Sequence, residues 1–184
     1  MRLKAADHVV AILALIWAVH LLNMLFGGAL NQFGIIPRNI SGLPGILFAP
    51  LLHKGWLHII SNSLPLFFLG WLVLQQGVAR FYLVSSIIVV VGGAAVWLLA
   101  RSAIHVGASG LVFGYFGCLL GFAYYQPNVK NILIAFVTLF FYGGMIWGVL
   151  PLQAMISWES HLFGLLAGVL ASAISHPPMQ RRGR

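Results

Sequence analysis

Serine and histidine residues in a few short segments have the types and spacing needed for nucleophilic chemistry. Ser109 lies among small residues in "HVGASGLVFGYFG" (105–117), just before a long apolar run. Its hydroxyl is either a helix cap or a nucleophile that an adjacent base must activate. His161 begins another apolar run, where an imidazole either hydrogen-bonds a neighbouring helix or supplies that base.

A second pair of polar residues lies in the apolar segment "LHIISN". His58 and Asn62 are four residues apart and share one helix face, either as a buried satisfied pair or as part of a site. His53 and His58 are five residues apart, unlike the usual helical pair of metal ligands, so we expect no metal. Among the other histidines, His20 and His176 are expected to lie away from this cluster as interface or packing residues, and His105 is interpreted as a loop residue.

Composition indicates an integral membrane protein. Of 184 residues, 61% are hydrophobic and 7% are charged, and the mean hydropathy is +0.99, whereas soluble domains carry about 25% charged residues. We expect one domain over residues 1–184. The net charge of +8 forms no basic face with interleaved aromatics, so nucleic acid is not an expected partner.

The scarcity of acids and thiols excludes several kinds of site. Asp7 and Glu159 are the only carboxylates and Cys118 is the only cysteine. Two-carboxylate glycosidase sites and Mg²⁺ cages need more acids than this. A single cysteine forms neither an internal disulfide nor a cysteine metal cluster.

Continuous apolar runs predict an all-α bundle of six transmembrane helices, because a span needs about 20 apolar residues. The runs do not alternate, which argues against a barrel. The N-terminal run is too long for a signal peptide and has no cleavage motif, so it is interpreted as a retained helix. The long Gly- and Pro-rich segment 28–57 is an expected outer loop lying partly in the membrane interface. The predicted helices are about 9–27, 58–76, 80–100, 109–126, 131–150 and 160–176.

Basic residues predict that both termini lie on the inner side of the membrane. With the N-terminus inside, the inner side carries Arg2, Lys4, Arg80, Lys130, Arg181, Arg182 and Arg184. The outer side carries Arg38, Lys54 and Arg101. In this topology Ser109, His161, His58 and Asn62 all lie at the outer ends of their helices.

Small residues recur at helical spacing in two of the predicted helices. The run 109–126 contains Gly110, Gly114, Gly117 and Gly121, and the run 160–176 contains Gly164 and Gly168. Such faces let membrane helices approach closely. If these two faces pack together, Ser109 and His161 meet at the same end, and a hydrogen bond between them is expected.

Together, "HKGWLHIISN" (53–62), "GASG" (107–110) and "HLFGLLAG" (161–168) resemble the rhomboid intramembrane serine proteases. The similarity covers about residues 45–176, including the order and spacing of the motifs and the six-helix layout. It implies that Ser109 is the nucleophile and His161 the general base. It further implies an oxyanion hole formed by His58, Asn62 and the Ser109 backbone N–H. The supporting residues that it implies are His53, Gly107, Gly110, Phe113, Gly164 and Gly168.

Two features depart from the family pattern. Phe113 stands where the family often has a tyrosine, so it can stack on the histidine but has no hydroxyl to donate. The Trp-Arg pair of the first outer loop is absent, and "LPGILF" occupies that region. Glu159 is two residues from His161 and points elsewhere on a helix, so we expect a Ser–His dyad oriented by packing, with Phe113 as one stacking partner.

The resemblance implies substrates that are transmembrane helices, entering sideways from the lipid past the helix at 131–150 and cut near the outer face. No cofactor is expected. Short loops and the absence of a transit peptide favour a bacterial inner membrane, with cytoplasmic termini. Two other functions were weighed: a catalytically inactive rhomboid-like protein that binds transmembrane helices, and a small transporter or channel. Against the latter, no internal repeat and no polar path through the midplane are found.

Overall fold

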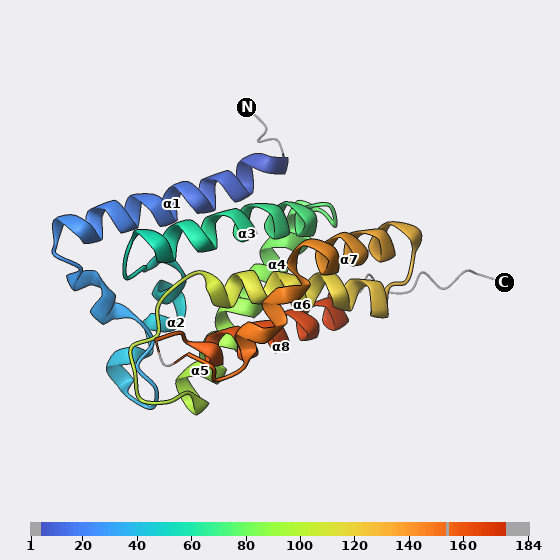
Figure 1. Cartoon of the computed structure of the whole chain (residues 1–184). Helices are drawn as coiled ribbons and strands as arrows, with labels where there is room; N and C mark the ends of the chain where they lie inside the picture. The colour runs from blue at the N-terminus through green and yellow to red at the C-terminus, as the bar shows by residue number, and fades with distance from the viewer. Residues whose placement is uncertain (1–4, 154, 176–184) are drawn as a thin grey trace.

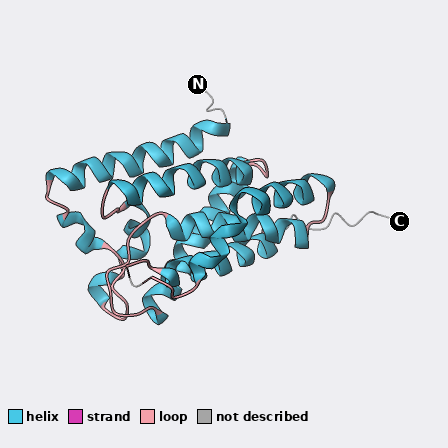
Figure 2. Cartoon of the chain, in the orientation of Figure 1, coloured by secondary structure: helices cyan, strands magenta, loops and turns pink. Residues whose placement is uncertain are grey.

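The structure, a computed structural model, describes residues 5–153 and 155–175, and its regular elements there are all helical (Figures 1 and 2). The prediction of an all-α protein is confirmed. The longer elements are α1 (Ala5–Leu25), α3 (Trp56–Leu74), α4 (Val78–Ile87), α5 (Gly93–Leu99), α6 (Ser109–Tyr125), α7 (Val129–Tyr142) and α8 (Trp158–Ile174). The π-helical turn η4 (Ile88–Gly92) joins α4 to α5, and the 3₁₀ helix η5 (Gly143–Val149) continues α7.

Each of the six predicted apolar segments corresponds to helix, but not every one has the length of a span. Within residues 5–153 and 155–175, four continuous helices are long and apolar enough to cross a membrane: Ala6–Leu25, Trp56–Leu74, Val78–Leu99 and Val129–Val149. The helices α6 and α8 are apolar but only 17 residues long. Six spans therefore remain a prediction.

Several predicted helices begin too late, because hydropathy marks where the lipid begins and not where backbone hydrogen bonding begins. The segments predicted to begin at 9, 58 and 160 begin at Ala5, Trp56 and Trp158. The end of the segment 160–176 lies outside the described residues. Five of the basic residues on which the predicted orientation rests also lie outside the described residues, as does His176. These five are Arg2, Lys4, Arg181, Arg182 and Arg184. Within the described chain, α1 begins and α8 ends at the same end of the bundle (Figure 1), as an even number of crossings requires.

The predicted outer loop 28–57 is not irregular. It contains the short helices η1 (Ala29–Phe33), η2 (Ile40–Gly42), α2 (Gly45–Phe48) and η3 (Ala49–Leu51), and ends where α3 begins. Arg38 and Trp97 brace it: the Arg38 amide donates to the Trp97 carbonyl at 2.8 Å, and the Trp97 indole donates to the Asn39 carbonyl at 2.8 Å. The Arg38 guanidinium also donates to the Ala100 carbonyl at 2.8 Å. This link between the loop and the end of α5 was not expected from sequence.

The helix α6 runs through the middle of the bundle between α3 and α8 (Figure 1), and most of its residues are buried. The backbone of α6 at Gly110 and Gly114 lies directly against the backbone of α8. A Cβ added to Gly164 would overlap the carbonyl of Gly110, and one added to Gly168 would overlap that of Gly114. The two helices therefore touch without intervening side chains, which fixes Ser109 and His161 at the same end of the pair.

Adding a methyl group at this contact should destabilise the protein. We expect Gly168→Ala to lower the free energy of unfolding by about 1–3 kcal/mol, because the new Cβ meets rigid backbone and not a movable side chain. Gly144→Ala is the matched control, since a Cβ there meets open space. Reversible unfolding of both variants in mixed micelles measures the difference, and equal stabilities would contradict the close contact.

Candidate active site

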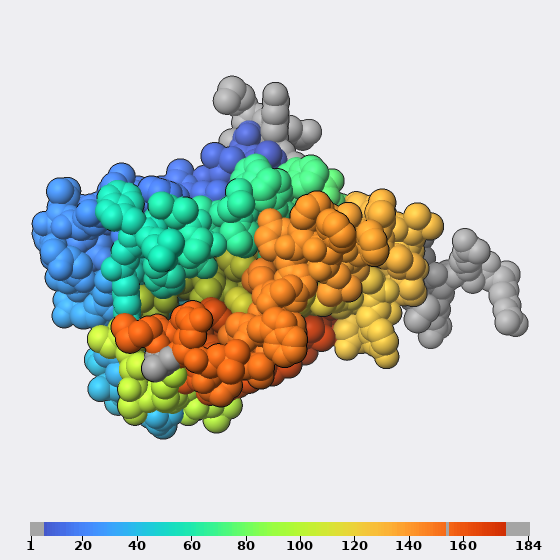
Figure 3. Space-filling view, in the orientation of Figure 1, coloured from blue at the N-terminus to red at the C-terminus, as the bar shows by residue number. Residues whose placement is uncertain are grey.

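Four of the polar residues singled out in the sequence border one cavity of about 900 Å³, and His53 is not among them. Ser109, His161, His58, Asn62 and Phe113 all line it, from α6, α8 and α3. Figure 3 shows a hollow between α3 and the chain leading to α8, through which atoms of α6 are visible. The fold thus collects residues that lie up to 103 positions apart, from His58 to His161, at one end of the bundle.

Ser109 is not the cap of its helix. It is the first residue of α6, the cap position belongs to Ala108, and no side chain caps the helix by a hydrogen bond. The cap interpretation of the serine is therefore wrong. The first backbone N–H groups of a helix have no partner within it, so Ser109 combines a hydroxyl and an amide N–H at the cavity.

The imidazole of His161 is held at one nitrogen and stacked on one face. Its Nδ1 lies 2.8 Å from the Gly148 carbonyl oxygen, and its ring stacks on Phe113 with centroids 4.1 Å apart and planes 7° apart. A carbonyl only accepts, so in the neutral ring the proton sits on Nδ1 and the lone pair on Nε2. His161 is therefore set up to accept a proton at Nε2.

Among the described residues, no carboxylate is hydrogen-bonded to His161. The Glu159 side chain is buried and its Oε1 lies 3.5 Å from Arg101 Nε, and it accepts from the Arg101 backbone N–H at 3.3 Å. The orientation of His161 comes instead from the carbonyl of Gly148 and from the ring of Phe113.

His58 faces the chain just before Ser109. The Lys54 amide donates to His58 Nδ1 at 3.4 Å, so in the neutral ring the proton sits on Nε2. Gly107 has φ +122°, and a Cβ there would lie 2.6 Å from His58 Nε2. Only glycine therefore leaves room for this imidazole. Asn62 donates from Nδ2 to the His58 carbonyl at 2.8 Å.

His53 is hydrogen-bonded to the segment that precedes Ser109 and does not line the cavity. Its Nε2 accepts from the Ala108 N–H at 3.3 Å, and its ring lies 4.9 Å from that of His58, centroid to centroid. Burial, with the neighbouring His58 charge as a smaller cause, lowers the pKa of His53 to about 4. The ring is therefore neutral at pH 7 and can accept the amide hydrogen bond.

His20 was expected to lie away from this cluster, and that prediction is wrong. Its ring packs edge-on against Trp56 at 5.1 Å and against His53 at 6.4 Å, centroid to centroid. The C-terminal part of α1 packs on the segment leading into α3, which brings His20 close to His53. Both of its ring nitrogens are buried without a hydrogen-bond partner.

Gly148 was missed in the sequence analysis. Its carbonyl orients His161, and a Cβ there would lie 2.7 Å from the Phe113 ring and 3.3 Å from His161 Nδ1. Only glycine leaves the space in which that stack forms. Nothing in the sequence distinguishes Gly148 from Gly143 and Gly144 nearby, since a backbone carbonyl has no sequence signal.

Two observations limit the chemistry of the cavity. Among the described residues, no group of three or more His, Cys, Asp or Glu side chains is arranged to hold a metal ion. In the part of the chain that the structure describes, no hydrogen bond joins the Ser109 hydroxyl to His161, so the bond expected from the sequence is not present, although both residues line the cavity. Catalytic hydrogen bonds are often longer without substrate and tighten when it binds.

Comparison with known proteins identifies the family. Residues 41–178 match the Rhomboid domain family. The chain is 37% identical to the Mycobacterium tuberculosis protein Rv1337, over 96% of this chain and 77% of that protein. It is 32% identical to "Putative rhomboid protease YdcA" of Bacillus subtilis, over 72% of this chain and 67% of that protein. With a domain match over most of its length, this multi-pass membrane chain belongs to the rhomboid family, whose members act on transmembrane substrates in the lipid bilayer.

Proposed function

We propose that this chain is an intramembrane serine endopeptidase that cleaves transmembrane helices by a Ser109–His161 dyad. The observation that carries the proposal is the state of His161. Its Nδ1 is committed to the Gly148 carbonyl, which leaves the Nε2 lone pair to act as a base in the cavity that Ser109 lines. We further propose one domain over residues 1–184, set in a bacterial inner membrane with both termini cytoplasmic.

In the first half of the reaction, Ser109 Oγ attacks the carbonyl carbon of the scissile peptide bond while His161 Nε2 takes the hydroxyl proton. The resulting imidazolium keeps its Nδ1–H bond to the Gly148 carbonyl. The tetrahedral intermediate then expels the amine, which receives the proton from Nε2. In the second half, water attacks the acyl-serine, again with His161 as base, and releases the carboxyl product and Ser109.

The negative charge that develops on the carbonyl oxygen needs donors. The Ser109 backbone N–H lies at the N-terminus of α6, where the helix dipole also favours an anion. His58 adds its Nε2–H, and Asn62 lies on the same face of α3 with its amide on the cavity lining. Loss of one such donor typically costs about 2.7–4 kcal/mol of transition-state stabilisation.

The substrate enters past α7 and the first half of η5, ahead of Gly148, whose carbonyl stays bonded to His161. Away from the cavity, Gln76 donates to the Asn131 side chain at 2.7 Å, and the Lys130 ammonium donates to the Gln75 carbonyl. Beside the cavity, η5 has no buried residue and includes Gly143 and Gly144. Val129–Val149 is also the least buried of the four long helices, so the part of it before Gly148 can move aside for a substrate helix.

The dyad is tested by substitution of its two members. We expect Ser109→Ala and His161→Ala to lose cleavage of transmembrane substrates in liposomes, and Ser109→Ala to lose labelling by a fluorophosphonate probe. Ser61→Ala serves as a control, because Ser61 also lines the cavity but is not in the mechanism. Folded wild type that neither cleaves nor labels would contradict the proposal and favour an inactive protein that binds transmembrane helices.

The stacking of Phe113 on His161 should matter for turnover more than for binding. We expect Phe113→Ala to lower kcat by about tenfold or more with a smaller change in KM, because the imidazole loses the face that fixes its orientation. Phe113→Tyr keeps the ring and should retain most of kcat. Steady-state cleavage of a transmembrane substrate measures both, and an equal loss in the two variants would contradict an orienting role.

The entry route is tested by locking α3 to η5 beside the cavity. In Ser61→Cys/Met145→Cys, a reducible bifunctional thiol reagent should block cleavage of transmembrane substrates, while the small fluorophosphonate probe still labels Ser109. The native Cys118 is buried and does not compete. The matched control joins Gln75→Cys to Lys130→Cys, where the helices are already tied. Cleavage that survives the first crosslink would rule out this route.

A further inference from the structure

A second serine–histidine hydrogen bond lies beside the proposed dyad. His105 Nδ1 and Ser157 Oγ are 2.5 Å apart, and both residues line the cavity that contains Ser109. His105 is in the segment leading to α6, and Ser157 immediately precedes α8. The bond therefore joins the chain before the proposed nucleophile to the helix that carries the proposed base.

The direction of each hydrogen bond follows from one fixed acceptor. His105 Nε2 lies 3.0 Å from the Arg101 carbonyl, which can only accept, so the proton is on Nε2. His105 Nδ1 then accepts from the Ser157 hydroxyl. The Ser160 hydroxyl, 2.7 Å from Ser157 Oγ, becomes the donor of the next bond. Burial lowers the pKa of His105, which keeps the ring in this neutral form.

Arg101 ties the same two segments together at a second point. Its Nη2 donates to the Ile156 carbonyl at 2.5 Å, and its backbone N–H donates to Glu159 Oε1 at 3.3 Å. On the other side, the backbone of His105 pairs with Ile35 through hydrogen bonds of 2.9 and 3.0 Å. The His105 segment is thus fixed both to the outer loop and to the start of α8.

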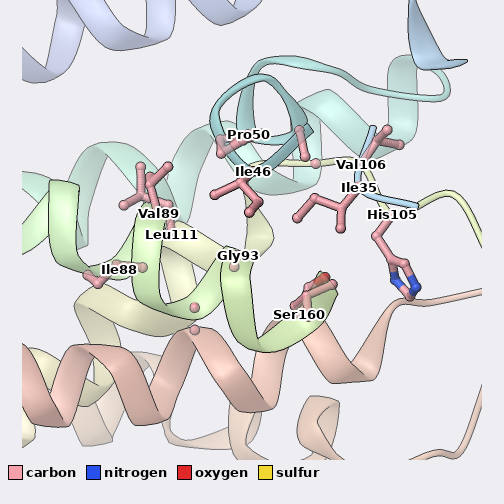
Figure 4. A pocket seen from close by; sticks show the side chains of 16 residues that line it. Ile35, Ile46, Pro50, Ile88, Val89, Gly93, His105, Val106, Leu111 and Ser160 are labelled. Atoms are coloured by element: carbon pink, nitrogen blue, oxygen red, sulfur yellow. The ribbon is translucent and has the colours of Figure 1, made fainter. Parts of the chain in front are cut away.

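The hydrogen bonds of this network matter for holding the two segments together, because side chains do not fill the space beside it. A smaller cavity of about 40 Å³ lies on the other side of this network, bordered by Ser160 and His105 among mostly apolar side chains (Figure 4). The network therefore separates two cavities. Ser160 also abuts α6: its carbonyl oxygen would lie 3.3 Å from a Cβ on Gly110, the neighbour of Ser109.

From this arrangement we propose that His105 is a positioning residue, which through Ser157 and Ser160 holds the start of α8, and with it His161, in reach of Ser109. The inference rests on the proposed function. His105 touches no reacting atom in this scheme. Its effect is to limit movement between a base and a nucleophile that lie on separate helices, where small displacements are costly to the rate.

Two substitutions at one position test the inference, with a control in the same loop. His105→Ala removes the acceptor for Ser157, whereas His105→Asn keeps an acceptor oxygen near the Nδ1 position. Ser102→Ala removes a hydroxyl that accepts from Arg38 and does not reach α8. Ser157→Ala removes the same bond from the other side, in case His105→Ala does not fold. The readouts are kcat and KM on a transmembrane substrate, and the rate and site of fluorophosphonate labelling.

We expect His105→Ala to lower kcat and the labelling rate of Ser109 by about tenfold to a hundredfold with KM changed less than about twofold. His105→Asn should restore most of both, Ser157→Ala should resemble His105→Ala, and Ser102→Ala should match wild type. A His105→Ala or Ser157→Ala protein as fast as wild type overturns the inference, as does a loss in KM alone or an equal loss in Ser102→Ala. Label on Ser157 also overturns it, since the pair would then be a second nucleophile.

These outcomes are distinct from a failure of the proposed function. If folded wild type is not labelled at Ser109, the dyad itself is wrong and the positioning role falls with it. If wild type is labelled and cleaves substrate, the dyad stands, and the His105 variants alone decide whether this network positions its base.

Discussion

Backbone contact between α6 and α8 is the constraint on which the rest of the site depends. Gly110 and Gly114 meet Gly164 and Gly168 with no side chain between them. In lipid, where apolar side chains gain little by leaving their solvent, such contact is a main source of helix association. It also sets the registry of the two helices, because a shift along the axis would bring side chains against backbone. This registry fixes the relative positions of Ser109 and His161, which lie at the same end of the two helices.

A site with few acids has to orient its histidines by other means. Three imidazoles around the cavity each have one nitrogen fixed by a backbone group: His161 by the Gly148 carbonyl, His105 by the Arg101 carbonyl, and His58 by the Lys54 amide. A neutral partner sets the tautomer without bringing another charge into a medium of low dielectric. The two carbonyls leave a lone pair on the opposite nitrogen, and the amide leaves a proton there. One type of side chain thus offers an acceptor at two positions and a donor at the third.

Most of the site could be predicted from the sequence because its parts carry local patterns. The spacing of His58 and Asn62 on one helix face, the serine in "GASG" and the glycine repeats of two helices are all visible in one dimension. What escaped prediction has no side-chain signal or joins distant segments. Gly148 acts through its carbonyl, and the proximity of His20 to His53 depends on how α1 packs. The predicted loop extends to residue 57, whereas α3 begins at Trp56, since hydropathy does not mark the first hydrogen-bonded turn.

The outer loop is supported although the Trp-Arg pair of the family is missing from it. The backbone of Arg38 has φ +57°, which is uncommon for a residue other than glycine. Both its backbone N–H and its guanidinium donate hydrogen bonds to the end of α5. Trp97 returns a bond to the loop at Asn39. An arginine and a tryptophan thus brace this loop from positions 59 residues apart, which no motif search over one loop detects. Through the Ile35–His105 bridge, that brace continues to the chain that leads into Ser109.

The side of the cavity formed by α6 and α8 is therefore held by backbone contact and a connected set of hydrogen bonds. The side formed by η5 has no buried residue, so the part of the cavity wall free to move is the stretch of η5 before Gly148, which does not contact the dyad.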